Sequence, residues 1–403
     1  MEMDMNVRLC PNCNKLLPAD AGYCEFCGEK LPPANRMGEV RKYAGQYLEL
    51  AGDLLREFWS ASDGGNMMIS PLSILLVLAM AADGAKGDTR DEILEKLGDP
   101  EAGEILGWLQ KEIARDPAFS SANALCVRHD AAPGIREEYR KRLKQVYKGE
   151  IFSSVNMARD VTEWIRENTR GMIRDEMPET LNSMLLCLLN AVAFEGNWER
   201  PYYDWEIGGR DFHNADGTVS KVQMLFGEER GHISSRDFTG FVKDYEGGHF
   251  RYMALLPKKE GKEALDAAIA RLDLNRLGDP IYATEVKTGL PEHSFGFTRE
   301  LEPILRALGI QKIFGRDADL SAMSAVQMPV ESIRHKTFID VDRAGTRAAA
   351  VTDFALPNCW EPEKRYQEVY LDRPFVFAIC WNMLPVFLGV VSHLEDTADE
   401  EKK

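Results

Sequence analysis

The hydrophobic residues change their period several times along the chain. Over residues 39–55 they recur at steps of three and four, which predicts an amphipathic helix, and a second is expected over residues 162–177. Residues 184–194 are almost continuously apolar, as in a strand buried on both faces. Further strands are predicted at residues 252–256, 375–381 and 385–391, and the last two would form a C-terminal hairpin. The pattern as a whole predicts a mixed α+β domain with a large sheet.

The most informative alternation lies in residues 335–356. Residues 335–341 alternate as a strand does. If residues 346–356 are also extended, the two charged residues, Arg347 and Asp353, lie on the same face. The opposite face carries no charge and begins with small side chains. Its residues are Thr346, Ala348, Ala350, Thr352, Phe354 and Leu356. Such a segment could slide between two existing strands. By parity alone, an ordinary strand or a short helix favoured by the alanine run stays open.

Composition narrows the choice of function. Of the 403 residues, 44% are hydrophobic, which is typical of a protein with a core. The net charge of −16 is spread along the chain, whereas nucleic acids and anionic membranes are bound by clustered Lys and Arg. The basic stretch at residues 136–148 is interleaved with glutamates, so we interpret it as a solvated helix. We therefore expect no nucleic-acid partner.

No apolar segment predicts export or a membrane anchor. Residues 1–9 lack the apolar core of a secretory signal. The most apolar stretch, residues 69–82, contains Pro71 and is shorter than the roughly 20 residues that a membrane-spanning helix needs. We expect a cytoplasmic monomer with no membrane partner.

Four of the eight cysteines lie within the first 27 residues, as two CxxC pairs. Cys10 with Cys13, and Cys24 with Cys27, can supply four thiolates to one tetrahedral zinc ion. The segment is too short to bury a core, so the metal would supply its folding energy, and four Cys ligands leave no open catalytic position. Two disulfides or free thiols are the alternative. The other four cysteines are scattered, which fits a reducing compartment.

These features divide the chain into four parts. Residues 1–33 are expected to form a zinc ribbon, and residues 34–39 a linker that follows two prolines. The main domain would span residues 40–395. Residues 396–403 are charged and are expected to form a solvated tail.

The stretch GTRAAAVT at residues 345–352 resembles the proximal hinge of the reactive loop of inhibitory serpins. The resemblance extends over nearly all of residues 40–395. Its further motifs, in the family's order, are ISPLSI at 69–74, GAKGDT at 84–89, GNWERP at 196–201, LP at 290–291, ADLS at 318–321, DRPFVF at 372–377 and FLG at 387–389. The resemblance implies the serpin fold: a large mixed sheet, two further sheets, eight or nine helices and an exposed reactive loop.

What the resemblance implies about function is a suicide-type inhibitor and not an enzyme. The metastable fold would hold the loop exposed, and a serine or cysteine protease would cut it. The severed loop would then join the main sheet as a new strand and trap the protease as a covalent acyl-enzyme. The hinge residues would be Gly345, Thr346, Ala348, Ala349, Ala350 and Thr352.

Other residues are assigned by the same resemblance. Ser70, Ser73, Asn190 and His335 match the polar cluster beneath the point where the sheet opens, and Trp198 matches the aromatic residue where insertion begins. An ordinary buried polar cluster and an ordinary core tryptophan are the plainer interpretations of the same residues.

The scissile bond is assigned by spacing. Counting from Gly345 gives Cys359–Trp360, which we prefer because the mechanism constrains insertion length. Counting back from Pro374 gives Glu363–Lys364, because this loop is longer than usual. Cys359 before the bond would suit an elastase-like protease, and it could also be a redox-sensitive thiol or a mere spacer. Leu356 or Phe354 would suit a chymotrypsin-like protease, and Arg365 a trypsin-like one.

Two residues depart from the family's pattern. Arg343 and Arg347 stand where serpins usually carry acidic residues, so we expect Arg343 to lose a salt bridge at the loop base. The alternative function is a non-inhibitory serpin that serves as a binding or chaperone module, with the zinc ribbon mediating protein contacts. The uncharged inserting face favours inhibition.

Overall fold

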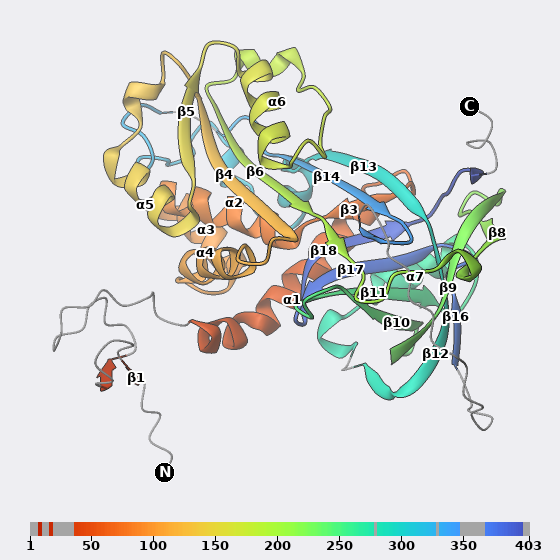
Figure 1. The fold of residues 1–403 in the computed structure, drawn as a ribbon. Helices are drawn as coiled ribbons and strands as arrows, with labels where there is room; N and C mark the ends of the chain where they lie inside the picture. Colours follow the sequence, from red (N-terminus) through yellow and green to blue (C-terminus); the bar gives the residue numbers. More distant parts are fainter. Residues whose placement is uncertain are drawn as a thin grey trace.

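The computed structural model describes residues 36–277, 280–327, 330–346 and 367–397, together with the backbone of residues 7–9 and 16–18. These residues contain eight α-helices (Figure 1). The helices are α1 (Met37–Ser60), α2 (Pro71–Gly84), α3 (Gly87–Leu97), α4 (Ala102–Ile113), α5 (Glu137–Tyr147), α6 (Met157–Asn168), α7 (Lys262–Ala270) and α8 (Glu302–Ala307).

The described strands form four sheets. A nine-stranded mixed sheet contains β16 (Gln367–Tyr370), β12 (Ile281–Pro291), β9 (Val219–Ser234), β10 (Phe238–Asp244), β11 (Phe250–Pro257), β17 (Phe375–Trp381), β18 (Leu384–Val391) and β3 (Met67–Ile69) in that order, with β8 (Ile207–His213) paired to β9. A four-stranded sheet has the order β13 (His293–Glu300), β14 (Arg334–Val341), β15 (Gly345–Thr346) and β7 (Gly196–Asn197). A three-stranded sheet has the order β5 (Glu150–Ser154), β4 (Phe119–Arg128) and β6 (Leu186–Phe194). A hairpin of β1 (Val7–Leu9) and β2 (Leu16–Pro18) completes the set.

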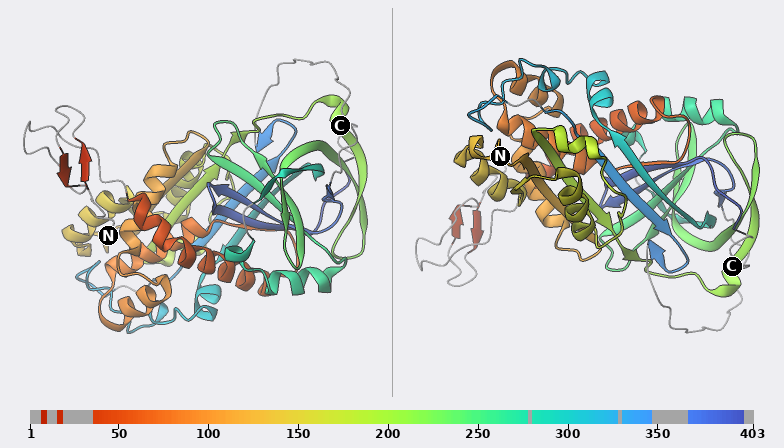
Figure 2. Two further views of the ribbon diagram at one scale, coloured as in Figure 1. Left: turned by 90° about the horizontal axis from the view of Figure 1, so that it is seen from below. Right: turned by 90° about the horizontal axis from the view of Figure 1, so that it is seen from above.

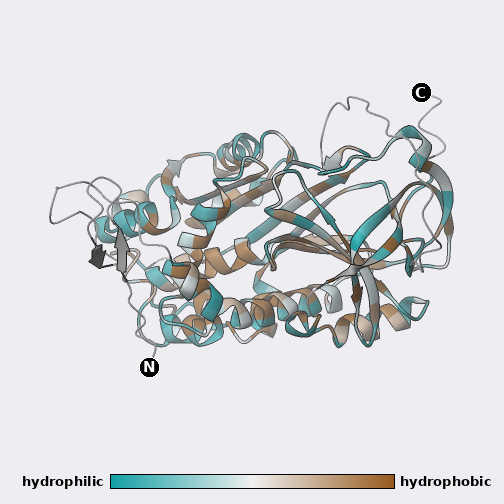
Figure 3. Ribbon diagram, turned by 60° about the horizontal axis from the view of Figure 1, so that its bottom comes forward, coloured by the Kyte–Doolittle hydropathy of each residue, from teal (hydrophilic) through white to brown (hydrophobic). Residues whose placement is uncertain are grey.

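Helix α2 is buried along almost its whole length, because its side chains are apolar on every face. It begins at Pro71, a residue favoured at the first helical position, and the Ser70 side chain accepts a hydrogen bond from the backbone N–H of Ser73. It packs against both β6 and β18 and so joins two sheets. Brown, hydrophobic residues accordingly gather in the interior, while teal marks the outward faces (Figure 3).

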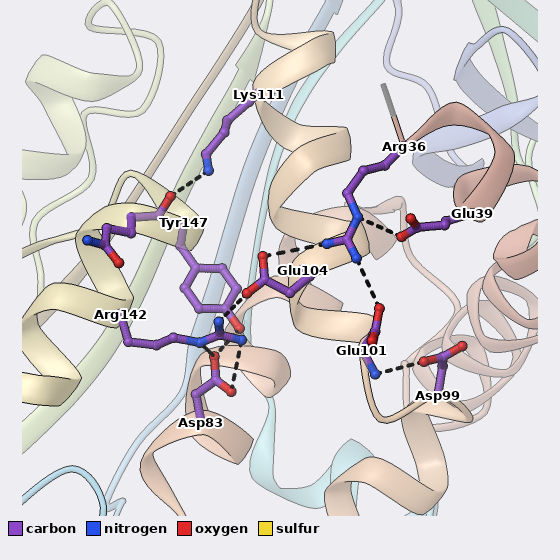
Figure 4. A network of polar contacts seen from close by, with 10 residues as sticks. Arg36, Glu39, Asp83, Asp99, Glu101, Glu104, Lys111, Arg142 and Tyr147 are labelled. Carbon is purple, nitrogen blue, oxygen red and sulfur yellow. Dashed lines mark hydrogen bonds and ion pairs between the residues drawn. The ribbon is translucent and has the colours of Figure 1, made fainter. Parts of the chain in front are cut away.

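The orange helices that follow α1 gather at one end of the molecule, and the green and blue strands of the nine-stranded sheet lie at the other (Figure 2). Helix α1 runs along one side between the two ends. Its first turn is anchored by ion pairs of Arg36 with Glu39, Glu101 and Glu104 (Figure 4). Glu104 also pairs with Arg142 of α5, which binds Asp83 of α2, so this network ties four helices together.

Most of the predicted elements are confirmed. The strand predicted at residues 375–381 is β17, and with β18 it forms the C-terminal hairpin. The helix predicted over residues 162–177 is wrong in its bounds, because α6 begins at Met157 and ends at Asn168. Arg170 and Gly171 follow with φ angles of 53° and 71°, a left-handed conformation that ends a helix.

Candidate strand-insertion site

The three- and four-stranded sheets meet at β6 and β14. Among the described residues, the pairing between these two strands is one parallel bridge, Leu188 with Ile333, near the start of both. At the far end, β15 lies between β14 and β7: Thr346 pairs with Val341 on one side and with Gly196 on the other. The strands are therefore joined directly at one end of this junction, whereas at the other end the two residues of β15 separate β14 from β7.

The turn before β15 is held by the side chain of Asp342. Its carboxylate accepts hydrogen bonds from the N–H groups of Ala344 at 2.7 Å and Gly345 at 3.0 Å, and its own N–H donates to the carbonyl of Gly345 at 2.9 Å. A Cβ atom at Gly345 would lie 2.2 Å from the carbonyl oxygen of Gly196. Glycine is required here because two backbones approach each other closely.

Trp198 binds the same turn from the opposite side. Its backbone N–H donates to the carbonyl of Ala344 at 2.9 Å, and its indole N–H donates to the carbonyl of Asp342 at 3.0 Å. The indole stacks on Tyr245 with ring centroids 4.4 Å apart, and the Tyr245 hydroxyl is hydrogen-bonded to the Thr346 hydroxyl at 2.6 Å. Trp198, Tyr245 and Thr346 are all buried. The aromatic pair therefore contacts the first residues of the predicted hinge directly.

Arg343 has acidic partners at the base of the loop. Its guanidinium forms an ion pair with Asp204, and its carbonyl accepts the N–H of Tyr202 at 2.9 Å. Burial raises the pKa of Glu292, and the positive charge of Arg343 partly opposes that rise. The expected loss of a salt bridge at Arg343 is therefore wrong, since acidic groups of other segments face this arginine.

The predicted polar cluster forms two pairs around the start of α2. The backbone N–H of Ser70 donates to His335 Nε2 at 3.0 Å, on β14, and the Ser73 hydroxyl donates to Asn190 Oδ1, on β6. Burial lowers the pKa of His335 to about 3, so the ring is neutral and its Nε2 can accept the hydrogen bond from Ser70. The first turn of α2 thus binds one strand on each side of the junction between the sheets.

Two contributors to this site were missed from the sequence. The Asn190 amide donates to Asn123 Oδ1 at 2.6 Å, and Asn123 in turn binds Gln110 at 2.9 Å and the carbonyl of Tyr147 at 2.8 Å. Tyr245 was also missed. The signal for Asn123 is an amide in the middle of a strand whose other residues, up to the final Arg128, are small or apolar. Tyr245 carries no sequence signal beyond its aromatic ring.

Several predicted residues lie outside the described residues. These are the hinge residues Ala348, Ala349, Ala350 and Thr352, the bond Cys359–Trp360, and the cysteines Cys10, Cys13, Cys24 and Cys27. In the part of the chain that is described, no group of three or more His, Cys, Asp or Glu side chains could hold a metal ion. None of the described helices has the length and apolarity needed to cross a membrane.

Fold and site together define a protein in which the two-residue strand β15 separates β14 from β7 at one end of the junction between two sheets. The chain belongs to the serpin family, because the model of that family, described as serpin (serine protease inhibitor), matches residues 46–394.

Individual relatives agree with this assignment. The tick protein Iris of Ixodes ricinus is 31% identical over 335 residues, which cover 78% of this chain and 88% of Iris. A serpin-like protein of Thermococcus kodakarensis is 29% identical over 343 residues, which cover 81% of this chain and 79% of that protein. Among solved structures, the thermophilic serpin tengpin in its native state superimposes with a TM-score of 0.80 at 28% identity, over 88% of this chain and 94% of tengpin.

Proposed function

We propose that this serpin is a suicide-type protease inhibitor, whose reactive loop is cut by a serine or cysteine protease and then inserts between β14 and β6. The observation that carries the proposal is that Gly345 and Thr346 form a short strand paired between β14 and β7. The alternating face that follows, from Thr346 to Leu356, can continue this strand with uncharged side chains inward.

The energy of insertion supports this function. Roughly ten new backbone hydrogen bonds, at about 0.5–1.5 kcal/mol each, give on the order of 10 kcal/mol. That sum is comparable to the whole stability of an ordinary domain. It is therefore large enough to distort a protease tethered to the loop.

Opening requires the two sheets to part further. Ser70 and Ser73 would permit this because each binds a different strand, His335 on β14 and Asn190 on β6. The first turn of α2 can release one strand while it keeps the other. The single bridge between Leu188 and Ile333 is the remaining backbone pairing between β6 and β14 in the described chain.

We assign the reactive bond to Cys359–Trp360 and favour an elastase- or chymotrypsin-like target. The test is incubation of the full chain with elastase-, chymotrypsin- and subtilisin-like proteases, followed by denaturing electrophoresis and sequencing of the released fragment. A covalent adduct is expected, together with a released fragment whose N-terminus is Trp360. Clean cleavage without an adduct would instead favour a non-inhibitory binding module.

Parity supplies a matched pair of variants for the same assay. Ala348→Arg places a charge on the inserting face, so the loop should be cut without forming an adduct. Ala349→Arg places the same charge on the outward face, so the adduct should persist. Equal behaviour of the two variants would contradict strand insertion.

We also propose that Cys10, Cys13, Cys24 and Cys27 hold one structural zinc ion. The β1–β2 hairpin supports this, because Cys10 and Cys13 both fall within the six residues that connect its strands, from residue 10 to residue 15. Metal analysis of the full chain should find one zinc per molecule, and none after Cys10→Ser and Cys13→Ser. Zinc retained in that variant would contradict the assignment.

We place this activity in a reducing compartment such as the cytoplasm. Cys126, Cys187 and Cys380 are buried free thiols, and burial raises the pKa of Cys126 and of Cys380 to about 12. Such thiols are inert and need no oxidising environment. A thiol titration of the denatured chain, purified without reductant, should find these three cysteines free.

A further inference from the structure

A lysine is buried behind the aromatic residues that hold the hinge. Lys243, near the end of β10, has only 2% of its side chain exposed, and its Nζ lies 2.7 Å from Glu229 Oε1 on β9. Lysine is almost never buried unless it is paired, because a charge loses its hydration there. The position of this ion pair, directly behind the hinge, therefore needs an explanation.

The backbone of β9 explains how the two side chains meet. Pairing between β9 and β10 runs from Ser234 to His232 and stops there. The next residue, Gly231, has a φ angle of 129°, a conformation that favours glycine. Beyond this irregularity the carboxylate of Glu229 reaches across to the ammonium of Lys243, which is still on the regular part of β10.

The lysine also contacts two aromatic rings. Its Nζ lies 4.3 Å from the ring centroid of Tyr202 and 5.4 Å from that of Trp198, within the range of cation–π attraction. Both residues donate hydrogen bonds to the hinge backbone: Trp198 to Ala344 and Asp342, and Tyr202 to Arg343. One fixed charge thus contacts both residues that hold the turn before β15.

We propose that Lys243 and Glu229 are positioning residues for strand insertion: Glu229 fixes the ammonium of Lys243, and the ammonium orients Trp198 and Tyr202 so that the hinge enters between β14 and β7 in one register. The proposal rests on the function proposed above and deepens it. Folding alone does not require these charges, because well-packed apolar residues commonly replace a buried ion pair without loss of stability.

The direct test is the double variant Lys243→Met with Glu229→Gln, which removes both charges and roughly keeps the side-chain volumes. Lys243→Met alone is unsuitable, since burial raises the pKa of Glu229 and would leave a carboxyl group without its counterion. The control removes another ion pair, Arg271 with Asp237, 2.9 Å apart, as Arg271→Met with Asp237→Asn. Asp237 directly precedes β10, so the control lies at the opposite end of the same strand from Lys243.

The readout is the rate at which a synthetic peptide of residues 346–356 anneals into the intact protein, measured beside the thermal midpoint. This rate requires no protease. We expect the K243M/E229Q variant to melt cooperatively but to take up the peptide about fivefold more slowly, the effect of losing roughly one cation–π contact. The control should anneal as the unmodified chain does, and Lys243→Arg, which keeps a cation, should anneal faster than K243M/E229Q.

Each outcome separates the two proposals. An unchanged annealing rate in K243M/E229Q would show that the ion pair is only structural and would overturn the positioning role. A slowed rate, in a protein that traps no protease, would uphold the positioning role and contradict inhibition. No uptake of the peptide by the unmodified protein would overturn both. If K243M/E229Q does not fold, Lys243→Arg compared with the double variant Lys243→Gln and Glu229→Gln gives the same test.

Discussion

The backbone N–H of Trp198 donates a 2.9 Å hydrogen bond to the carbonyl of Ala344. Trp198, which directly follows β7, thus binds the residue that precedes Gly345. The indole N–H of Trp198 adds a second bond, to the carbonyl of Asp342. Residues 342–344 are thereby fixed next to β15, where the proposed insertion would start.

Replacing the indole of Trp198 should show whether this residue acts in loop insertion as well as in the stability of the fold. Trp198→Phe keeps an aromatic ring against Tyr245 but loses the 3.0 Å bond to Asp342, at a cost of about 0.5–1.5 kcal/mol in the free energy of unfolding. Trp59→Phe is the matched control, because Trp59 donates a 2.9 Å bond to Asp266 and no described contact links it to the hinge. Chemical denaturation should show similar losses for both variants. Only Trp198→Phe should raise the fraction of molecules whose loop is cut without forming a covalent adduct with the protease.

The hinge glycine should not tolerate a side chain. Gly345→Ala forces a shift of the backbone, because the new Cβ would lie 2.2 Å from the carbonyl oxygen of Gly196, and overpacking of this kind costs about 1–3 kcal/mol. Gly209→Ala on β8 is the control, since no atom lies within 4 Å of the place that its new Cβ would take. Thermal melts should show a lower midpoint for Gly345→Ala alone. An equal midpoint for both would mean that the hinge does not occupy this place.

The ion pair of Arg343 with Asp204 should contribute little to stability and more to the placement of the loop. Both side chains are largely exposed, so Arg343→Ala should lower the free energy of unfolding by no more than about 1 kcal/mol, and less at high salt. Arg343→Glu should repel Asp204 and Glu292, and Arg343→Glu with Asp204→Arg should recover part of the loss. The check is denaturation at low and high ionic strength. A loss that does not depend on salt would contradict the electrostatic account.

Stability should fall in acid because of two buried histidines. Burial lowers the pKa of His335 to about 3 and that of His293 to about 4, so the unfolded chain binds protons at a pH where the native chain does not. Stability attributable to each ring is complete above pH 6.5 and is lost as pH falls toward the native pKa, at a slope of up to about 1.4 kcal/mol per pH unit. His335→Gln should flatten this slope between pH 6 and pH 4 in urea denaturation. An unchanged slope would contradict the assignment of a neutral, buried ring.

Cleavage of the loop should make the protein more stable. Insertion of a severed strand adds on the order of 10 kcal/mol of backbone hydrogen bonding, so a nicked sample should melt well above the intact one. Calorimetry of intact and nicked protein measures this directly. Equal midpoints would show that no strand had joined the sheet.

Much of the fold could be predicted from the sequence, because its signals are local. The run at residues 375–381 is apolar at every position, and it forms β17, buried on both faces. The helix predicted over residues 162–177 is too long because Ile173 continues the apolar period past Arg170 and Gly171. At that point the backbone conformation, rather than the hydrophobic pattern, decides where the helix ends.

The residues of the site differ in how far sequence could identify them. Ser70, Ser73, Asn190, His335 and Trp198 follow from motifs that resemble the family, and their place in the structure is around the junction of two sheets. Their roles in opening stay predictions. Asn123, Tyr245, Lys243 and Glu229 have no motif, because each matters only through a neighbour distant in sequence.

The sequence by itself determined several of the helices and strands, the family, and the uncharged face of the segment after Gly345. These depend on spacing along the chain, which hydrophobic periodicity records. Only the tertiary structure decided that Arg343 faces acidic groups, that the first turn of α2 binds both β6 and β14, and that a buried ion pair lies behind Trp198. Contacts of this kind depend on which distant segments the fold brings together, and no local pattern of residues encodes them.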